Sequence, residues 1–468
     1  MAAAGLTPDD LAPLLREHLG PGARCGSILR GPIGNGQETW FVAVDGAGPP
    51  GGLVLRRSAE GGALPWTDRA LEFAVLRAVE PHGLPVPAVL WLETQPSSLG
   101  RPYLVMERAP GAPLGRADAA TRRAVAEQLG RALARLHALP LDGLGLDLPR
   151  PPDGAAAARE ELRRWADRYR SARLSPVPLL GALVAWLEAN APDGDAPVVL
   201  LWGDPGPHNV LVAEGRVSAL LDWELTHLGH PLDDLGAAVW ACDGSLDPAL
   251  VVEAYESEGG VRVHGPTLRW FECLACVSRS VMLLDGNRAY AEGRTIRPAM
   301  AGLGLELLAS CLERAARAAG WPEAAEVAAP APGAPAGLRP SAAEMAHGVG
   351  RFLSDEVLDG LDDRALRQGV KVAAALLETV ALRAAIEPAV QAERERAERS
   401  LLAELAAGGV ETPGLEEAAV RVERDEELAG WRPRVRGHLL DDLALARTLL
   451  EPLHRLYSPD APRGRRAG

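Results

Sequence analysis

The chain has 468 residues, of which 47% are hydrophobic and 24% charged, a balance typical of globular proteins with two or three domains. Its formal net charge of −14 argues against a broad nucleic-acid-binding surface, which requires a basic patch or stripe. No apolar run reaches the roughly 18 residues of a membrane span, and acidic residues near the start are unlike a secretory leader. We therefore expect a cytoplasmic protein that binds neither membrane nor nucleic acid.

The first 110 residues predict a short helix followed by a small β-rich region. Residues 1–20 carry Leu11, Leu14, Leu15 and Leu19 on one helical face. Short β-like runs bounded by Gly- and Pro-rich turns then follow. They predict strands at 27–30, 39–44 and 52–56, a helix at 67–80, and further strands within 85–93 and 102–111.

The middle of the chain changes to long helical patterns with one β-rich interruption. Helices are predicted at 120–139, 155–171 and 176–190, and again from 234 to about 320. Between them, residues 198–222 predict a strand, a tight loop, a strand, a turn and a strand. Cys273 and Cys276 form a CxxC pair within an apolar helical run. Zinc would need two further ligands, so this pair is expected to be packing.

The last third of the chain predicts a separate helical domain. Residues 327–340 are rich in Ala, Pro and Gly and predict a linker, and residues 341–458 are almost entirely helix-patterned. This region contains no glycine-rich loop and no compact group of acidic and histidine residues. It is expected to serve docking or oligomerisation rather than a second chemistry, with a protein partner or self-association through 341–458.

The segment with the clearest chemistry runs from Trp202 to Asn209, WGDPGPHN, and is followed by Asp222-Trp-Glu. Phosphoryl transfer needs positioning, neutralised charge and a base beside the attacking hydroxyl. A carboxylate on a tight loop can be that base. An amide oxygen five residues on, with a carboxylate on the next hairpin, can hold magnesium, which prefers oxygen ligands. A β-hairpin with turn-forming residues is the alternative interpretation of each element taken singly.

These motifs resemble the aminoglycoside phosphotransferase-like kinases, in which the loop reads (His/Trp)-Gly-Asp-x-x-x-x-Asn before an Asp-(Trp/Phe)-(Glu/Gly) motif. The resemblance implies that Asp204 is the catalytic base and that Asn209 and Asp222 bind Mg²⁺. The run LGHPLDDLG is similar to the family's Gly-Asp-Pro-x-x-Asp-Leu run. Asp234 would brace the catalytic loop, whereas His230 replaces the family's first aspartate.

The resemblance also assigns residues of the β-rich region to ATP binding. Gly34, Asn35 and Gly36 lie in a glycine-rich turn between two strands, where backbone N–H groups could face phosphate oxygens. The family's third strand carries a basic residue paired with a helix glutamate, which implies Arg56 and Glu72. A surface ion pair is the alternative. The family uses lysine here, and Lys371 is the only lysine of this chain.

The resemblance covers about residues 20–320 and implies a bilobal architecture. The strand PYLVMERAPG is similar to the hinge between lobes, so Glu107 and Arg108 would present backbone groups to adenine. We predict an α+β, protein-kinase-like fold with a small β-rich N-terminal lobe and a mainly helical C-terminal lobe, plus an all-α C-terminal domain. The predicted boundaries are 1–107, 108–326, a linker at 327–340, and 341–468.

The implied function is an ATP- and Mg²⁺-dependent small-molecule kinase that phosphorylates a hydroxyl. Segments such as VLRR, GLPVPAVLWLE and GRPYLVMERAPG are similar to the branch fused to acyl-CoA dehydrogenases, which suggests a hydroxyacyl acceptor. A nucleotide-binding regulatory pseudokinase is one alternative, favoured by Arg56. Metal-dependent hydrolysis is another, but His208, His227 and His230 lack the spacing of a helical metal motif.

Overall fold

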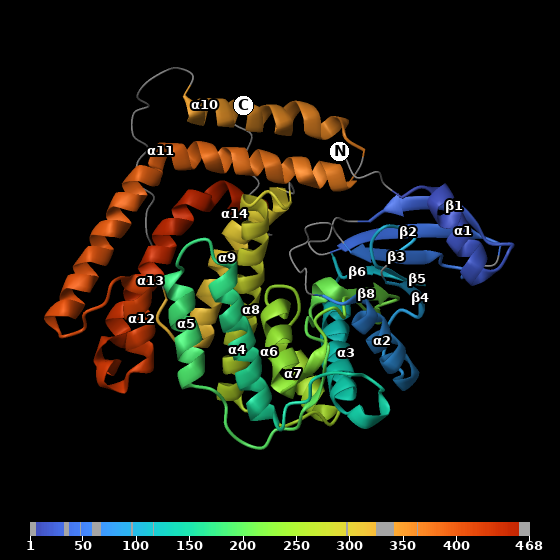
Figure 1. Cartoon of the computed structure of the whole chain (residues 1–468), viewed down its shortest axis with the longest axis horizontal. Helices are drawn as coiled ribbons and strands as arrows, with labels where there is room; N and C mark the ends of the chain where they lie inside the picture. Colours follow the sequence, from blue (N-terminus) through green and yellow to red (C-terminus); the bar gives the residue numbers. More distant parts are fainter. Residues whose placement is uncertain are drawn as a thin grey trace. The chain divides into compact units, whose positions relative to one another are not determined.

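The computed structural model describes most of the chain (Figure 1), with the described residues being 6–31, 37–46, 48–58, 67–94, 97–115, 117–295, 298–323, 341–362 and 364–457. Backbone contacts divide the chain into two compact units. The first comprises Met1–Glu161 and Ala191–Ala275, and the second comprises Leu162–Asn190 and Cys276–Gly468. The predicted linker at 327–340 lies outside the described residues, and the predicted domain boundaries stay predictions.

The first unit opens with a five-stranded antiparallel sheet in the order β1-β2-β3-β5-β4. Its strands and the helices beside them are α1 (Pro8–Leu19), β1 (Arg24–Arg30), β2 (Gln37–Asp45), β3 (Leu53–Ser58), α2 (Arg69–Val79), β4 (Val89–Glu93) and β5 (Tyr103–Glu107). A short 3-10 turn, Glu80–His82, ends α2. The five predicted strands and both predicted helices are therefore confirmed, although the observed ends differ from the predicted ones.

Residue alternation along β3 decides which side chains face the core. Leu53 and Leu55 are buried in a cluster with Leu11, Leu14 and Leu15 of α1, so α1 covers one face of the sheet. Successive residues of a strand point to opposite faces. Arg56 therefore points to the other face, away from α1.

The remainder of the first unit holds two small antiparallel sheets, β10-β7 and β6-β8-β9, among helices. The elements are β6 (Ala112–Pro113), α3 (Ala119–His137), α4 (Gly154–Ala172), β7 (Val199–Leu201), β8 (Val210–Ala213), β9 (Arg216–Leu220), β10 (His227–Gly229), α6 (Pro231–Cys242), α7 (Pro248–Ser257) and α8 (Gly265–Ala291). Short 3-10 turns lie at Leu141–Gly143 and Pro207–Asn209. The three-residue strand β10 was not predicted. Cys273 and Cys276 are both buried in α8, as expected for packing residues.

The second unit is helical in all its described regular structure, as predicted for residues 341–458. It includes α5 (Pro178–Ala189), α9 (Pro298–Ala318), α10 (Ala342–Phe352), α11 (Arg364–Ala407), α12 (Leu415–Arg424), α13 (Arg432–Arg447) and α14 (Glu451–Tyr457), with the C-terminal part of α4 and the end of α8. Shorter helical turns join them at Leu353–Val357, Leu358–Gly360, Glu426–Trp431 and Thr448–Leu450. The helix α11 bends in Figure 1 and contains Pro388, which removes a hydrogen bond within the helix.

One hydrogen bond and two ion pairs join α12 to the helices of the second unit that precede it in sequence. Tyr169 donates to Glu416 at 2.6 Å, and Arg173 forms an ion pair with the same carboxylate. Arg424 lies 2.5 Å from Glu188. These contacts tie residues 162–190 to residues that follow position 340, so α5 and the C-terminal part of α4 share a unit with the C-terminal helices.

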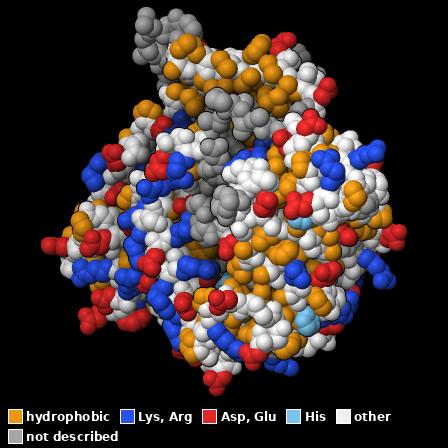
Figure 2. Space-filling view, turned by 45° about the vertical axis from the view of Figure 1, so that its right-hand side comes forward, with side chains coloured by type: hydrophobic (Ala, Val, Ile, Leu, Met, Phe, Trp, Pro, Cys, Tyr) orange, Lys and Arg blue, Asp and Glu red, His pale blue; other side chains and the backbone are white. Residues whose placement is uncertain are grey.

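One face of α10 is apolar and exposed. Met345, Val349 and Phe352 are 54%, 50% and 57% exposed and lie about one helical turn apart. Figure 2 shows apolar side chains gathered on the helices at its top. None of the described helices combines the length and apolar character needed to cross a bilayer.

Candidate active site

The predicted catalytic loop begins where β7 ends and is held by one carboxylate. The backbone N–H of Trp202 donates to Asp234 Oδ2 at 2.7 Å, and that of Gly203 donates to Oδ1 at 2.8 Å. Asp234 is 1% exposed and lies in the first turn of α6, where the helix dipole favours a negative charge. This carboxylate therefore fixes the two residues that precede Asp204.

Asp234 is itself oriented by a histidine that the sequence analysis missed. His137, at the end of α3, lies with Nε2 at 3.2 Å from Asp234 Oδ2 and Nδ1 at 2.9 Å from the Tyr255 hydroxyl. All three side chains are buried, where a satisfied polar network restricts motion. The run around His137 offers no spacing to a second polar residue that could have indicated this contact.

Asp204 and Asn209 meet across the loop. Asn209 Nδ2 donates to Asp204 Oδ2 at 2.8 Å and to the Asp204 carbonyl at 3.0 Å. With its amide nitrogen used in this way, Asn209 offers Oδ1 as an acceptor or ligand. His208 Nε2 lies 3.2 Å from the same Asp204 oxygen. The Asp204 side chain is 22% exposed, so the carboxylate can still be reached from solvent.

Pairing of β8 with β9 brings Asp222 beside the loop. Val210 is the partner of Leu220, and the Leu221 N–H donates to the Asn209 carbonyl at 2.8 Å. Asp222 has a φ of +62°, a left-handed conformation that is uncommon for residues other than glycine. Such backbone strain concentrates at functional sites. The structure thus places Asp222 and Asn209 at the same end of one hairpin.

Arg56 connects the N-terminal sheet to this hairpin. Its Nη1 pairs with Glu72 of α2, and its Nη2 lies 2.7 Å from Asp222 Oδ1. The Glu72 side chain is fully buried and that of Arg56 is 13% exposed, so the pair is not a surface ion pair. Burial opposes the charge of Arg56, but the carboxylates of Glu72 and Asp222 raise the pKa of Arg56 above its usual range. Arg56 is therefore permanently cationic at this position.

Three further residues belong to the same charge network and were not singled out from the sequence. Arg69 pairs with Glu72 and lies 2.6 Å from Glu224, which also accepts from Gln37 Nε2 at 2.5 Å. Burial, and then the charge of Asp222, raise the pKa of Glu224. Glu224 is the third residue of the Asp-Trp-Glu motif, and that position was the one available signal for it.

The structure describes only some of the other residues that were predicted to bind ATP. Gly34, Asn35 and Gly36 lie outside the described residues. The N–H of Glu107 donates to the Ala88 carbonyl at 2.8 Å, and that of Arg108 donates to Gly52 at 3.0 Å. Because these N–H groups already have partners in the chain, any contact of this strand end with adenine would use carbonyl oxygens. The Arg108 guanidinium stacks over the Phe41 ring at 4.8 Å.

His230, which stands where the resembled family has its first aspartate, serves as a helix cap. Its Nδ1 accepts from the Leu232 N–H at 3.0 Å at the start of α6, and its ring lies 4.6 Å from that of Phe271. Burial, helped by the nearby His137, lowers the pKa of His230 to about 4. The ring is therefore neutral at neutral pH and can accept this hydrogen bond.

Comparison with known families agrees with this geometry. Residues 28–271 match the model of the APH phosphotransferase enzyme family, and this segment is more than half of the chain. The chain belongs to the APH phosphotransferase family. Members of this family are small-molecule kinases that use ATP with a divalent metal.

The most similar relatives include two acyl-CoA dehydrogenase family members. Member 11 from Rattus norvegicus is 34% identical over 190 residues, which cover 39% of this chain and 24% of the relative. Member 10 from Mus musculus is 27% identical over 249 residues, which cover 51% of this chain and 23% of the relative. The chain thus spans about a quarter of the length of these relatives.

A solved structure confirms the kinase-like fold. A protein from Ralstonia eutropha, provisionally assigned as an aminoglycoside phosphotransferase, aligns with a TM-score of 0.52 at 22% identity. The alignment covers 67% of this chain and 98% of that protein. The APH-family fold is therefore the predicted α+β kinase-like one.

The candidate site fits a divalent ion of the kind used by APH kinases. Asp222 and the Oδ1 atom of Asn209 are oxygen donors of the type such ions prefer. The buried network around them contains two arginines and three carboxylates, those of Glu72, Asp222 and Glu224, and so carries an excess of one negative charge. A cation bound beside Asp222 would neutralise that excess.

The conformation of Gly203 yields a testable prediction. Gly203 has a φ of +88°, and a Cβ atom there would lie 2.4 Å from the Leu225 carbonyl oxygen. Gly203→Ala is expected to lower the free energy of unfolding by about 2–3 kcal/mol and to displace the predicted catalytic loop, as measured by urea denaturation and turnover.

Gly215→Ala is the matched control for this prediction. Gly215 has a similar φ of +73° but nothing within 4 Å of a Cβ atom. Gly215→Ala should therefore lower the free energy of unfolding by only about 1 kcal/mol, from backbone strain alone. Equal losses for the two variants would contradict the steric argument.

Proposed function

We propose that the chain is an ATP- and Mg²⁺-dependent phosphotransferase that moves the γ-phosphate of ATP to a hydroxyl of a small molecule. The observation that carries this proposal is the convergence of Asp204, Asn209, Asp222 and Arg56 at one end of the β8–β9 hairpin. Membership of the APH family supports the same reaction class. Phosphoryl transfer relies on such positioning and charge neutralisation more than on covalent chemistry.

In this proposal Asp204 accepts the proton of the acceptor hydroxyl. Its carboxylate is held by Asn209 Nδ2 and approached by His208, while one side remains open to solvent. As the hydroxyl oxygen bonds to the γ-phosphorus, the bond to the bridging oxygen breaks and ADP leaves with that electron pair. A base within reach of the hydroxyl typically contributes a rate factor of about 10²–10⁴.

Asn209 and Asp222 would hold Mg²⁺, and Arg56 would face the phosphates. The bound ion would neutralise phosphate charge and orient the γ-phosphate. Arg56 is anchored by Glu72, so its guanidinium is positioned without a substrate. An arginine can contact phosphate oxygens through two N–H groups, whereas lysine acts as a point charge.

We propose a hydroxyacyl compound as the acceptor class. The relatives named acyl-CoA dehydrogenase family members support this choice, although they match over only part of their length. The test is ADP formation with hydroxy acids, their CoA esters, amino alcohols and aminoglycosides as separate acceptors. Stimulation by hydroxyacyl compounds alone supports the proposal, and stimulation by aminoglycosides alone would replace it.

A nucleotide-binding regulatory protein without turnover is the second candidate. The observation that favours it is that Arg56 replaces the family's lysine and pairs with Asp222. It predicts that Mg-ATP raises the melting temperature while no acceptor promotes ADP formation. Acceptor-dependent turnover would exclude it.

We also propose that the chain self-associates through residues 341–458. The exposed apolar row of Met345, Val349 and Phe352 on α10 supports this, because a symmetric contact would bury the same row on both copies. Light scattering is expected to show a dimer that Met345→Glu with Phe352→Glu converts to a monomer. A native chain that stays monomeric at high concentration would contradict the proposal.

A further inference from the structure

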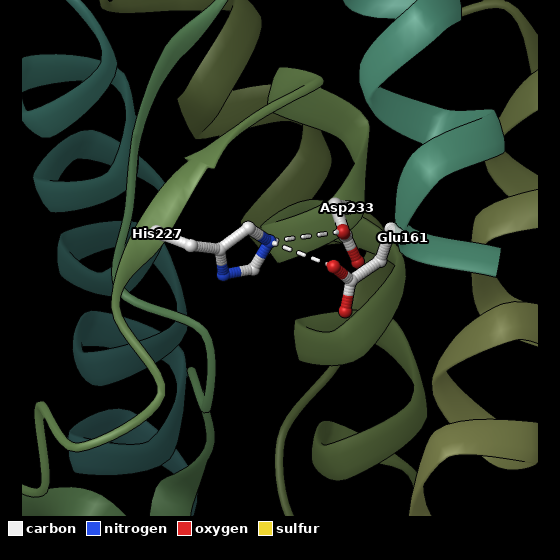
Figure 3. A group of neighbouring side chains, drawn as sticks. All are labelled: Glu161, His227 and Asp233. Carbon is white, nitrogen blue, oxygen red and sulfur yellow. Dashed lines mark ion pairs between the residues drawn. The ribbon is translucent and has the colours of Figure 1, made fainter. Parts of the chain in front are cut away.

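Three side chains outside the catalytic constellation converge from three separate elements (Figure 3). Glu161 lies on α4, His227 on β10 and Asp233 in the first turn of α6. His227 Nε2 is 3.6 Å from Glu161 Oε2 and 3.6 Å from Asp233 Oδ2. One potential ligand atom from each residue lies within 4.8 Å of the other two. The group is partly buried, with side chains 11–20% exposed.

The orientation of the His227 ring is set from its other side. Its Nδ1 lies 2.9 Å from the Leu225 carbonyl, and since that oxygen can only accept, Nδ1 carries the hydrogen. In the neutral ring Nε2 therefore presents a lone pair toward the two carboxylates. Metal-binding histidines are typically fixed in this way, with the second ring nitrogen donating to a backbone carbonyl.

A lone pair that faces two carboxylates requires a positive charge between them. Three arrangements supply it: a proton on Nε2, a proton on one of the two carboxylates, or a metal ion bound by all three groups. The separations of 3.6 Å favour the metal, because a proton shared between Nε2 and a carboxylate oxygen would usually bring the two atoms to about 2.7–2.9 Å.

We propose that Glu161, His227 and Asp233 bind a divalent transition-metal ion of the zinc type, separate from any ion that accompanies ATP. One imidazole and two carboxylates form a donor set that zinc accepts, with bonds of about 2.0–2.2 Å. Two ligands of a tetrahedral ion with such bonds lie about 3.4 Å apart. The separations of 3.6 Å between His227 Nε2 and each of the two carboxylate oxygens are close to this value. Three protein ligands leave a fourth position for water.

The position of the site gives the ion a structural consequence for the catalytic loop. His227 is the β-sheet partner of Leu201, the last residue before Trp202. Asp233 directly precedes Asp234, which holds the loop backbone. An ion bound here would fasten β10 and the start of α6 to α4, and so fix both supports of the loop. The three ligands would act as positioning residues and would not contact substrate.

The experiment is a titration of the full chain with Co²⁺, a visible-absorbing substitute for zinc, in the absence of nucleotide. The native chain is expected to bind one equivalent with the intense visible bands of four-coordinate Co²⁺, and Zn²⁺ is expected to displace it. Zn²⁺ should also raise the melting temperature, because a ligand that binds only the folded state stabilises it.

Variants separate this site from the candidate active site. His227→Gln is expected to weaken Co²⁺ binding at least about 100-fold, since even loss of an outer partner costs 10–100-fold. Glu161→Gln is a second variant for the case in which His227→Gln fails to fold. His264→Gln, which changes an exposed histidine of the same unit, and Asp222→Asn should both keep the absorption.

Two results would overturn the inference. One is a native chain that shows no Co²⁺ bands and no Zn²⁺-dependent change in melting temperature, in which case a proton on the ring or on a carboxylate takes the place of the metal. The other is a folded His227→Gln or Glu161→Gln chain that binds Co²⁺ as tightly as the native chain does. Loss of the bands in Asp222→Asn alone would place the ion at the candidate active site instead.

Discussion

Asp204→Asn is expected to lower kcat for acceptor phosphorylation by about 10²–10⁴-fold, the usual contribution of a positioned base. The amide cannot take the hydroxyl proton, but its oxygen can still accept the hydrogen bond from Asn209 Nδ2. The loop should therefore keep its shape. Binding of Mg-ATP, measured by calorimetry, is expected to change by less than about threefold, because Asp204 is not among the proposed ligands of the ion.

Asp195→Asn is the matched control for this substitution. Asp195 is exposed and lies outside the catalytic loop, so the same chemical change there should leave kcat unaltered. An Asp204→Asn chain that keeps more than a tenth of the native kcat would show that Asp204 is not the base. A chain that loses Mg-ATP binding together with turnover would show instead that the loop is disrupted.

Arg56→Ala is expected to have the second largest effect, on both activity and stability. Removal of one preorganised donor to a developing negative charge typically lowers kcat by about 10²–10³-fold. The change also leaves the buried Glu72 with Arg69 as its remaining cation, and a broken buried pair costs about 3–5 kcal/mol. We expect the free energy of unfolding, measured by urea denaturation, to fall by about 3 kcal/mol because Arg69 stays. The KM for ATP, measured with kcat, should rise because a phosphate contact is lost.

Arg57→Ala separates the two effects. Arg57 lies on the opposite face of β3 and pairs with Glu38, whose side chain is only 6% exposed. Its loss should also destabilise the fold but leave the KM for ATP unchanged. Arg56→Lys is expected to stay within about tenfold of native turnover, because the ammonium can still supply the charge. Equal KM values for ATP in Arg56→Ala and Arg57→Ala would remove Arg56 from the proposed phosphate site.

Local patterns in the sequence were sufficient for much of the fold. Local patterns predicted the strand that contains Arg56 and the helix that contains Glu72, and the resemblance to the kinase family then paired these two residues. The tight turn between β8 and β9 fixed the spacing of Asn209 and Asp222, so these residues could be grouped from their order alone. Each of these inferences depends on neighbours within about twenty residues.

The missed residues come together from parts of the chain that are far apart in sequence. His137 and Asp234 are 97 residues apart, and Arg69 and Glu224 are 155 apart. No periodicity reports such pairs, because they depend on how helices pack rather than on local geometry. The same reason hid the Glu161–His227–Asp233 group. β10 was missed because three residues are too few for a pattern of alternation.

The measurement that most directly tests the central claim is transfer of radiolabel from [γ-³²P]ATP to a hydroxyacyl acceptor, for the native chain beside Asp204→Asn. The account predicts a phosphorylated acceptor that forms with the native chain, requires Mg²⁺, and falls at least about 100-fold with the variant. Label that appears only as inorganic phosphate, or equally with both chains, would contradict it.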